Sequence, residues 1–328
     1  FEVEMRKVAR LRGDSLLNED NVRSYLAQVA PVPFHPEFSL GEKIAAHLRE
    51  RGVREPIEVR LDGDLEPIYH RARDHIEFGE KHKDIVQSVE FLEFLGRDGD
   101  VEAFGWVLDH AYLGAVPRRL GLGGIRLRTG NIQVGDENIL GHLYPEPRFA
   151  SWAIGDIHIE SRSVLPNARR DEFEASVAYA YLQDEFTIFL KRIAHIIRER
   201  SLVRNRIRKA HAALALADQW LDQVRGKDVP HAVLQRIRAI VEQRIGEAQQ
   251  QLDKVSVESA EAAQLRHRVG TTAGRRTKLL KDGDPARGRR SAQDKAIDVA
   301  IGVILEHAAT PTAGLTMSRR VLNAFEAS

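Results

Sequence analysis

Two long stripes of apolar residues at helical spacing restrict what the second half of this chain can fold into. The stripes cover 186–221 and 233–252, with apolar positions three and four residues apart along each. Only "RGKDVP" separates them, and its Pro230 suits the start of a new helix. Because two long helices joined by a short turn bury their apolar faces against each other, we expect an antiparallel coiled-coil hairpin over 177–255.

Helices and strands alternate before residue 177. One helix is expected in "LLNEDNVRSYLAQVAPVPF", where Pro31 and Pro33 end it, and a second around 40–51, where Gly52 ends it. Strands are expected in "IEVRL" (57–61), "EPIYH" (66–70), "FGWVLDHAYLG", "GGIRLRTGNIQVGD" and "SWAIGDIHIESRSVL", the last with a β-bulge at Gly155. This mixture predicts one domain over 21–176 and places the chain in the α+β class.

The remaining segments give weaker signals. The opening "FEVEMRKV" alternates apolar and charged residues, which is typical of a half-buried strand, and a chain that opens inside a strand without Met is expected to be part of a longer one. Residues 256–294 are rich in Gly, Ser, Thr and Arg without periodicity, so a basic flexible linker is expected. A last amphipathic helical segment is expected in 295–328.

Composition excludes several functional classes. The chain contains no cysteine, which rules out disulfides, thiolate metal sites and cysteine nucleophiles and suits the cytoplasm. No apolar run approaches the roughly 18 residues that span a bilayer, so no membrane partner is expected. There is no G-x-x-x-x-G-K-[ST] motif, and "GLGG" precedes a strand instead of a helix, which indicates a plain turn.

The segment "DIHIE" places Asp156, His158 and Glu160 on one face of a strand. Two carboxylates and an imidazole can bind a divalent metal ion, but a solvated strand face is the interpretation we favour. No resident metal site is predicted, and no H-E-x-x-H motif occurs.

Clusters of arginine stand out because the net charge is only +1. Such clusters neutralise nucleic-acid phosphates, and the alternative is a solvated helix face followed by a soluble tether. The candidate phosphate contacts are Arg198, Arg204, Arg208, Arg275, Arg276, Arg289 and Arg290.

A second basic feature lies in "SVLPNARRDEFEAS". Pro166 disfavours helix in the residue before it and Asn167 is a good N-cap, so a helix is expected to start there with Arg169 and Arg170 in its first turn. Free amides and forked guanidinium groups at a helix start suit an anion. The alternative is that these arginines pair with Asp171, Glu172 or Glu174 at the surface.

Three consecutive segments resemble one known family. "NIQVGDENIL", "YPEPRF" and "WAIGDIHIESRSVLPNARRDEFE" are similar in order to the middle segment of the ninety-kilodalton heat-shock chaperones and their bacterial relatives, and the resemblance covers roughly 100–176. The segment "YLAQVAPVPFHPEF" looks like the linker helix that follows the ATPase domain in bacterial members and in MORC-like proteins. These proteins are GHKL ATPases, alongside gyrase and MutL.

The resemblance implies a transducer domain of the ribosomal-protein-S-five-domain-two-like type, without the N-terminal ATPase domain that precedes it in the family. Residues 1–20 would then be the last strand of that ATPase domain and the exit from it. Arg170 then matches the catalytic arginine that reaches the γ-phosphate of ATP, and Asn167 and Arg169 belong to the same loop. ATP with Mg²⁺ is bound mainly by the missing domain, so ATP hydrolysis is expected only together with it. A homodimer whose arm moves with ATP state, acting on a client or effector protein, is the implied assembly. The alternative is a non-enzymatic basic coiled-coil scaffold that binds nucleic acid or a protein partner.

Overall fold

The computed structural model describes residues 18–61, 64–79, 82–227, 229–255, 259–280 and 292–326. The chain divides into two compact units, 1–201 and 202–328, and helix α3 (Val177–Val224) continues from the first into the second. A six-stranded mixed sheet combined with long helices confirms the α+β class. The strand expected at the start of the chain lies outside the described residues.

The sheet of the first unit has the order β1-β2-β3-β6-β4-β5. Its strands are β1 (His75–Glu77), β2 (Lys83–Leu95), β3 (Val101–His110), β4 (Gly124–Thr129), β5 (Ile132–Val134) and β6 (Ile154–Ile159). Strands β4 and β6 are parallel neighbours, and the other neighbouring pairs are antiparallel. The strand structure expected in "GGIRLRTGNIQVGD" is therefore confirmed, and it consists of the antiparallel pair β4 and β5.

Two expected strands do not form. Residues 57–61 and 66–70 belong to no strand and make only scattered backbone contacts, such as the bond from Ile68 N to Val59 O and the isolated bridge between Phe34 and His70. Conversely, the 13-residue strand β2 is absent from the strands expected above, although buried and exposed positions alternate along its second half.

The β-bulge expected at Gly155 is also wrong. The pairing of β6 with β4 continues through Gly155, and the pairing of β6 with β3 extends to Gly155, both without a register shift. A Cβ atom at this position would lie 2.3 Å from the carbonyl oxygen of Trp106. Glycine is required here because two backbones approach closely, not because the chain bends.

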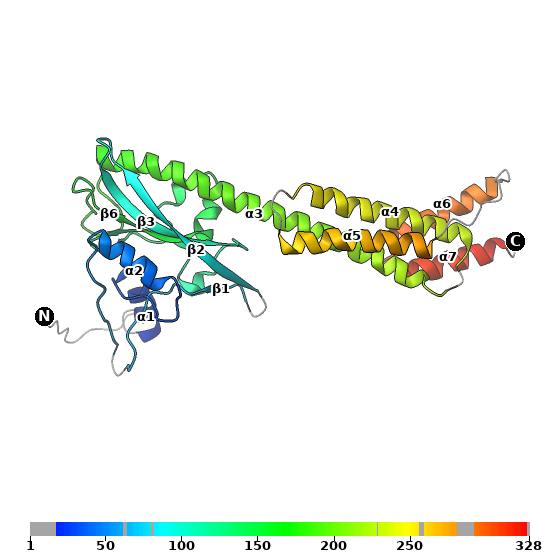
Figure 1. The fold of residues 1–328 in the computed structure, drawn as a ribbon, viewed down its shortest axis with the longest axis horizontal. Helices are drawn as coiled ribbons and strands as arrows, with labels where there is room; N and C mark the ends of the chain where they lie inside the picture. Colours follow the sequence, from blue (N-terminus) through cyan, green and yellow to red (C-terminus); the bar gives the residue numbers. More distant parts are fainter. Residues whose placement is uncertain are drawn as a thin grey trace. The chain divides into compact units, whose positions relative to one another are not determined.

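The two faces of the sheet have different chemistry. One face is apolar, and its residues Val107, Leu127 and Ile157 share a core with Leu182 and Phe186 of α3. Figure 1 shows the first part of α3 running along this face, with α1 (Glu19–Val29) and α2 (Gly41–Glu50) on the opposite side. The helices expected at both places near the N-terminus are thus confirmed.

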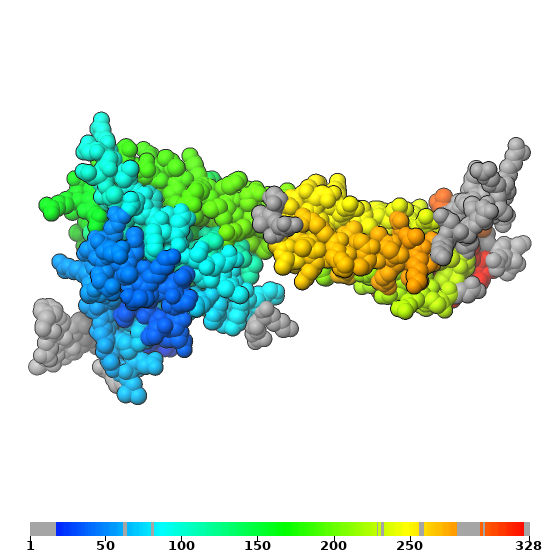
Figure 2. Space-filling model, in the orientation of Figure 1, coloured from blue at the N-terminus to red at the C-terminus, as the bar shows by residue number. Residues whose placement is uncertain are grey.

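Helix α2 and the segments around it cover the second face. Ile44 of α2 packs in a core with Phe38, Trp106, Leu108 and Ile154. In the space-filling view the blue segment with α1 and α2 lies directly against the cyan strands (Figure 2). This cover turns what the sequence indicated as a solvent-facing side of β6 into an interior.

The second unit contains the remainder of α3 with α4 (His231–Asp253), α5 (Ala260–Leu279), α6 (Ala292–His307) and α7 (Pro311–Glu326). Leu221 near the end of α3 shares a core with Val233 at the start of α4, whereas Ile207 shares one with Leu252. This pairing is antiparallel, as expected. The part of α3 before residue 202 packs on the sheet instead, because its apolar stripe has two successive partners.

The expected linker over 256–294 contains helix α5 and the start of α6. Ser259 Oγ caps α5 by accepting from Ala262 N at 3.1 Å. Arg268 and Arg275 of α5 both bond to Asp218 of α3, which explains how such a basic segment packs as a helix. The C-terminal helical segment consists of α6 and α7, which pack on each other. No helix in the described part of the chain has the length and apolarity to cross a membrane.

Candidate functional site

The segment 167–172 forms a tight turn in place of the expected helix start. Pro166 and Phe173 make an isolated antiparallel bridge, and inside it Asn167 N donates to Glu172 O at 2.9 Å. The Asn167 side chain accepts from Asp171 N at 3.2 Å and donates to Asp171 Oδ1 at 2.6 Å. Because a short polar side chain that bonds nearby backbone competes with helix, α3 begins only at Val177, where Ser176 Oγ accepts from Tyr179 N.

Arg170 is the most constrained residue of this turn. Its φ is +56°, a left-handed conformation that is unusual for a residue other than glycine. Its carbonyl accepts from Gly135 N at 2.8 Å, and its Nη2 donates to Thr129 O at 3.2 Å and Ile132 O at 3.3 Å. The turn is therefore fastened to the β4–β5 hairpin through both the backbone and the guanidinium of Arg170.

The other two residues expected to bind phosphate have different partners. Arg169 Nε lies 3.0 Å from Asp171 Oδ2, and both side chains are exposed, so this pair contributes about 0–1 kcal/mol. This contact is the surface pairing given in the sequence analysis as the alternative to an anion site. The amide of Asn167 is engaged by Asp171. Of the two arginines, only Arg170 directs its guanidinium at neutral acceptors.

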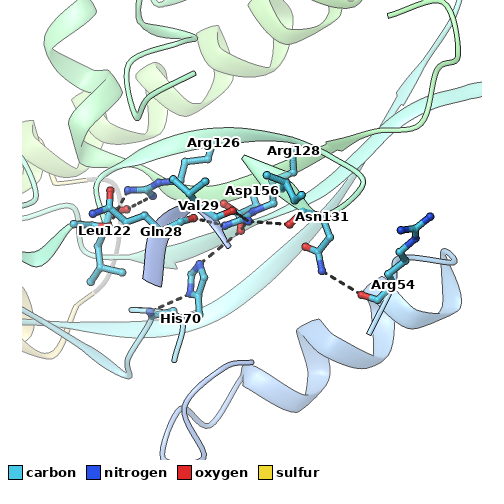
Figure 3. A network of polar contacts seen from close by, with 12 residues as sticks. Gln28, Val29, Arg54, His70, Leu122, Arg126, Arg128, Asn131 and Asp156 are labelled. Carbon is cyan, nitrogen blue, oxygen red and sulfur yellow. Dashed lines mark hydrogen bonds and ion pairs between the residues drawn. The ribbon is translucent and has the colours of Figure 1, made fainter. Parts of the chain in front are cut away.

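The hairpin turn that binds Arg170 also leads to a buried polar network (Figure 3). Asn131 O, within that turn, accepts from Arg128 Nη1 at 3.3 Å. Arg128 Nη2 donates to Gln28 O at 2.9 Å, at the C-terminal end of α1, and its Nε donates to Asp156 Oδ2 at 2.9 Å. A chain of polar contacts thus joins the Arg170 turn, the hairpin and α1.

Burial and charge set the protonation of this network. His70 Nδ1 accepts from Ala72 N, so its proton sits on Nε2, which faces Asp156 Oδ2 at 3.7 Å. Burial by itself would raise the pKa of Asp156, but Arg128 and His70 hold that pKa far below its usual range. Burial lowers the pKa of His158 to about 4, so this imidazole is neutral near pH 7. Arg126 donates to Leu122 O and Gly121 O.

The solvated strand face expected for "DIHIE" is wrong for two of its three residues. Asp156 and His158 are each 4% exposed, whereas Glu160 is exposed. Arg126 and Arg128 are not among the candidate residues named from the sequence, and they lie opposite Asp156 and His158 across the parallel pair. Basic and acidic residues alternating with period two in neighbouring strands would have been a usable signal. Within the described ranges, no group of three or more His, Cys, Asp or Glu side chains is arranged to hold a metal ion.

The arginines expected to contact nucleic acid are largely engaged within the protein. Arg198 pairs with Glu146, Arg275 with Asp218 and Asp222, and Arg276 with Glu242. Arg208 Nη2 donates to Asn205 Oδ1 at 3.1 Å, and Arg204 is half-buried on α3. Arg289 and Arg290 lie outside the described residues. Nucleic-acid binding through these side chains stays a prediction.

Neither a family model nor a curated protein nor a solved structure matches this chain. The class that the fold defines is an α+β protein with a curled mixed sheet and long helices. The resemblance of its sequence motifs to one family stays a prediction.

Proposed function

We propose that the first unit is the transducer module of a bacterial GHKL-type ATPase and that Arg170 senses the terminal phosphate of ATP bound by a separate domain. The observation that carries this proposal is the position of the Arg170 guanidinium, which is exposed and shared between the carbonyls of Thr129 and Ile132. The left-handed backbone of Arg170 adds support, because conformations of this kind cluster at functional sites.

Hydrogen-bond strength favours a phosphate oxygen over the present acceptors of the Arg170 guanidinium. Its present acceptors are two neutral carbonyls at 3.2 and 3.3 Å. A hydrogen bond from a guanidinium to a charged phosphate oxygen is shorter and stronger than one to a neutral acceptor. A phosphate brought to this turn would therefore compete well for the side chain, whereas the backbone of Arg170 stays tied to Gly135.

The donor set of the turn fits a phosphate through Arg170 alone. The side chains of Asn167 and Arg169 are both engaged by Asp171, whose carboxylate would repel a phosphate. ATP supplies the charged γ-phosphate and the bond that is cleaved, and Mg²⁺ would be held with it by the separate domain. In this proposal Arg170 stabilises charge at the terminal phosphate, and its contact ends when that phosphate is released.

The polar chain behind Arg170 gives this contact a route to α1. When Arg170 leaves Thr129 and Ile132, the hairpin turn loses a cross-link to the 167–172 turn. The same hairpin turn remains bonded to Arg128, which holds the last carbonyls of α1. We propose that a shift of the turn is passed to α1 in this way, and that closure of a homodimer and movement of the helical arm follow.

Turnover of ATP by the full-length protein tests the proposal. Arg170→Ala should reduce turnover by about 10²-fold or more with little change in nucleotide affinity, a loss at the low end for removing a charge-stabilising arginine. Arg169→Ala is the matched control and should have little effect, because Arg169 pairs with Asp171 at the surface. Equal turnover in the two variants and the wild type would reduce Arg170 to a structural residue of the turn.

A further inference from the structure

A surface pocket of about 430 Å³ lies beside α1 and β1 in the first unit. Four arginines and two glutamates line it, namely Arg23, Arg71, Arg73, Arg119, Glu66 and Glu77. With histidine counted as neutral, the four arginines and two glutamates carry a net charge of +2. Because a concave surface with one sign of charge concentrates ions of the opposite sign, this pocket should attract anions.

The surplus of positive charge persists when the ion pairs of the lining are taken into account. Arg23 pairs with Asp64. Glu77 pairs with Lys83, whose Nζ lies 3.4 Å from Glu77 Oε1. The lining charges that remain are three arginines and Glu66, so two positive charges are still in excess.

These three arginines donate to neutral backbone carbonyls. Arg71 Nη1 donates to Leu120 O and Arg119 Nη2 donates to Glu77 O, both at 3.2 Å. Arg73 Nη1 donates to two carbonyls one and three residues before it, at 2.8 Å each. In the described part of the chain none of the three forms an ion pair, and each keeps one Nη atom without a partner. The carbonyls thus hold each guanidinium in place and leave its charge uncompensated.

Burial makes two of these charges unfavourable. Arg71 and Arg73 are half-buried, whereas Arg119 is exposed. Burial lowers the pKa of both half-buried arginines; for Arg73 the exposed Glu37 opposes this shift and the positive charge of Arg71 adds to it. An anion in the pocket would offset the lost hydration and the mutual repulsion of these groups through charge-assisted hydrogen bonds.

The number of charges and donors narrows the class of anion. A phosphate monoester carries a charge of about −1.5 to −2 and three strong acceptor oxygens, which matches an excess of two positive charges and three arginines. A carboxylate has one charge and two oxygens, and a phosphate diester has one charge and two free oxygens, so both use the pocket less fully.

We propose that this pocket binds a phosphate dianion, free or as the terminal group of a small phosphate monoester. Arg71, Arg73 and Arg119 donate to its oxygens through the Nη atoms that have no partner in the described residues. The site is separate from the Arg170 turn, and the inference does not depend on the proposed ATPase role.

Calorimetric titration of the full chain with three probes tests the inference. The probes are inorganic phosphate, methyl phosphate and dimethyl phosphate, at about pH 8 and an ionic strength of about 0.15 M, which screens non-specific attraction. We expect saturable binding of at least one of the two dianions with a Kd of roughly 1 mM or tighter. Dimethyl phosphate should bind about tenfold or more weakly, since it has one charge and two free oxygens. Methyl phosphate that binds at least as tightly as inorganic phosphate assigns the pocket to a monoester, and tighter binding of inorganic phosphate assigns it to the free ion.

Two neighbouring arginines then locate the binding. Arg119→Gln removes a lining charge and should weaken binding of the dianion about tenfold. Arg118→Gln is the matched control and should leave the affinity unchanged, because Arg118 is exposed on the same short 3₁₀ helix η1 (Arg118–Leu120) but does not line the pocket.

The double variant Arg73→Gln with Arg119→Gln should abolish binding. Circular dichroism confirms that each variant is folded, and Arg119→Gln alone decides if the double variant is not. The inference is overturned if neither dianion saturates the wild type, if dimethyl phosphate binds equally well, or if Arg119→Gln binds like Arg118→Gln.

Discussion

Arg128 Nε donates to Asp156 Oδ2 across 2.9 Å in a position where both residues are almost fully buried. The pair joins the parallel strands β4 and β6, and the same guanidinium holds the end of α1 through Gln28 O. Because a buried guanidinium and carboxylate are costly to desolvate, we expect the pair to contribute mainly by fixing one arrangement of the sheet and α1.

The ion pair should respond very differently to single and double substitution. Asp156→Ala leaves a buried guanidinium uncompensated and should lower the free energy of unfolding by about 3–5 kcal/mol. The double variant Arg128→Met with Asp156→Leu removes both charges, so its free energy of unfolding should fall clearly less than that of Asp156→Ala. Urea denaturation, followed through the unfolding transition of the first unit, measures the free energy of unfolding of both variants.

The exposed pair of Arg192 and Glu90 supplies the control. Its nitrogen and oxygen atoms lie 2.6 Å apart, but both side chains are nearly half exposed. Arg192→Ala should therefore cost about 0–1 kcal/mol. A loss as small as this in Asp156→Ala would mean that the buried pair does not hold the sheet and α1 together.

Mild acid should destabilise the first unit through its buried histidines. The pKa of His158 is lowered to about 4 by burial, from an ordinary value near 6.5. Between these pH values the unfolded chain binds more protons than the folded one, so stability falls as the pH drops from about 6.5 to 4. For His158 alone the loss is about 3 kcal/mol, and burial also lowers the pKa of His70.

Denaturation of the wild type and His158→Phe at a series of pH values checks this prediction. The variant should lose a large part of the dependence between pH 6.5 and 4 and keep the part that comes from His70. The groups that act on His158 are Asp156, Arg128 and His47, and none of them is removed by the substitution. Identical pH profiles would show that His158 is solvated in the folded protein.

The sequence was sufficient to predict those parts of the fold that depend on local pattern. The apolar stripes of α3 and α4 and the alternation in the segment of β4 and β5 follow from residue spacing, and the helices and strands expected there form. It was insufficient where a distant segment changes the environment of a strand. Asp156 and His158 alternate like solvent-facing residues, and they are buried only because residues 30–56 lie over them.

The candidate site also combines features that the sequence predicts with features that it does not. The grouping of Asn167, Arg169 and Arg170 in one short segment is visible in the sequence, but the conformation of that segment is not. A turn replaces the expected helix because Asn167 bonds to Asp171 and Pro166 pairs with Phe173. The attachment of Arg170 to Thr129 and Ile132 links positions about forty residues apart, which no local pattern reports.

Nucleic-acid binding by the arm should be weak, independent of sequence and strongly dependent on salt. Since Arg275 and Arg276 pair with acidic residues, the contacts should come mainly from exposed Arg208 and from Arg289 and Arg290. Fluorescence anisotropy with two unrelated duplexes should show affinity falling by orders of magnitude between about 50 and 200 mM salt.

Charge removal is a better test of this binding than truncation, because deleting the chain after residue 256 would also remove the packed helix α5. Replacing Arg208, Arg289 and Arg290 by Gln should abolish duplex binding, and replacing exposed Arg60 of the first unit by Gln should not. If the wild type fails to bind even at low salt, the arm serves a protein partner or dimerisation instead.

We propose that Arg170 couples the terminal phosphate of ATP to α1 through the β4–β5 hairpin. Hydrogen exchange of the full-length protein, compared between a non-hydrolysable ATP analogue and ADP, tests this coupling. We expect amides in 129–135 and 26–30 to change their protection with the analogue and not with ADP, and we expect Arg170→Ala to remove the difference while Arg169→Ala keeps it. Equal exchange of both segments in the two nucleotide states, with nucleotide bound, would show that Arg170 does not couple the phosphate to α1.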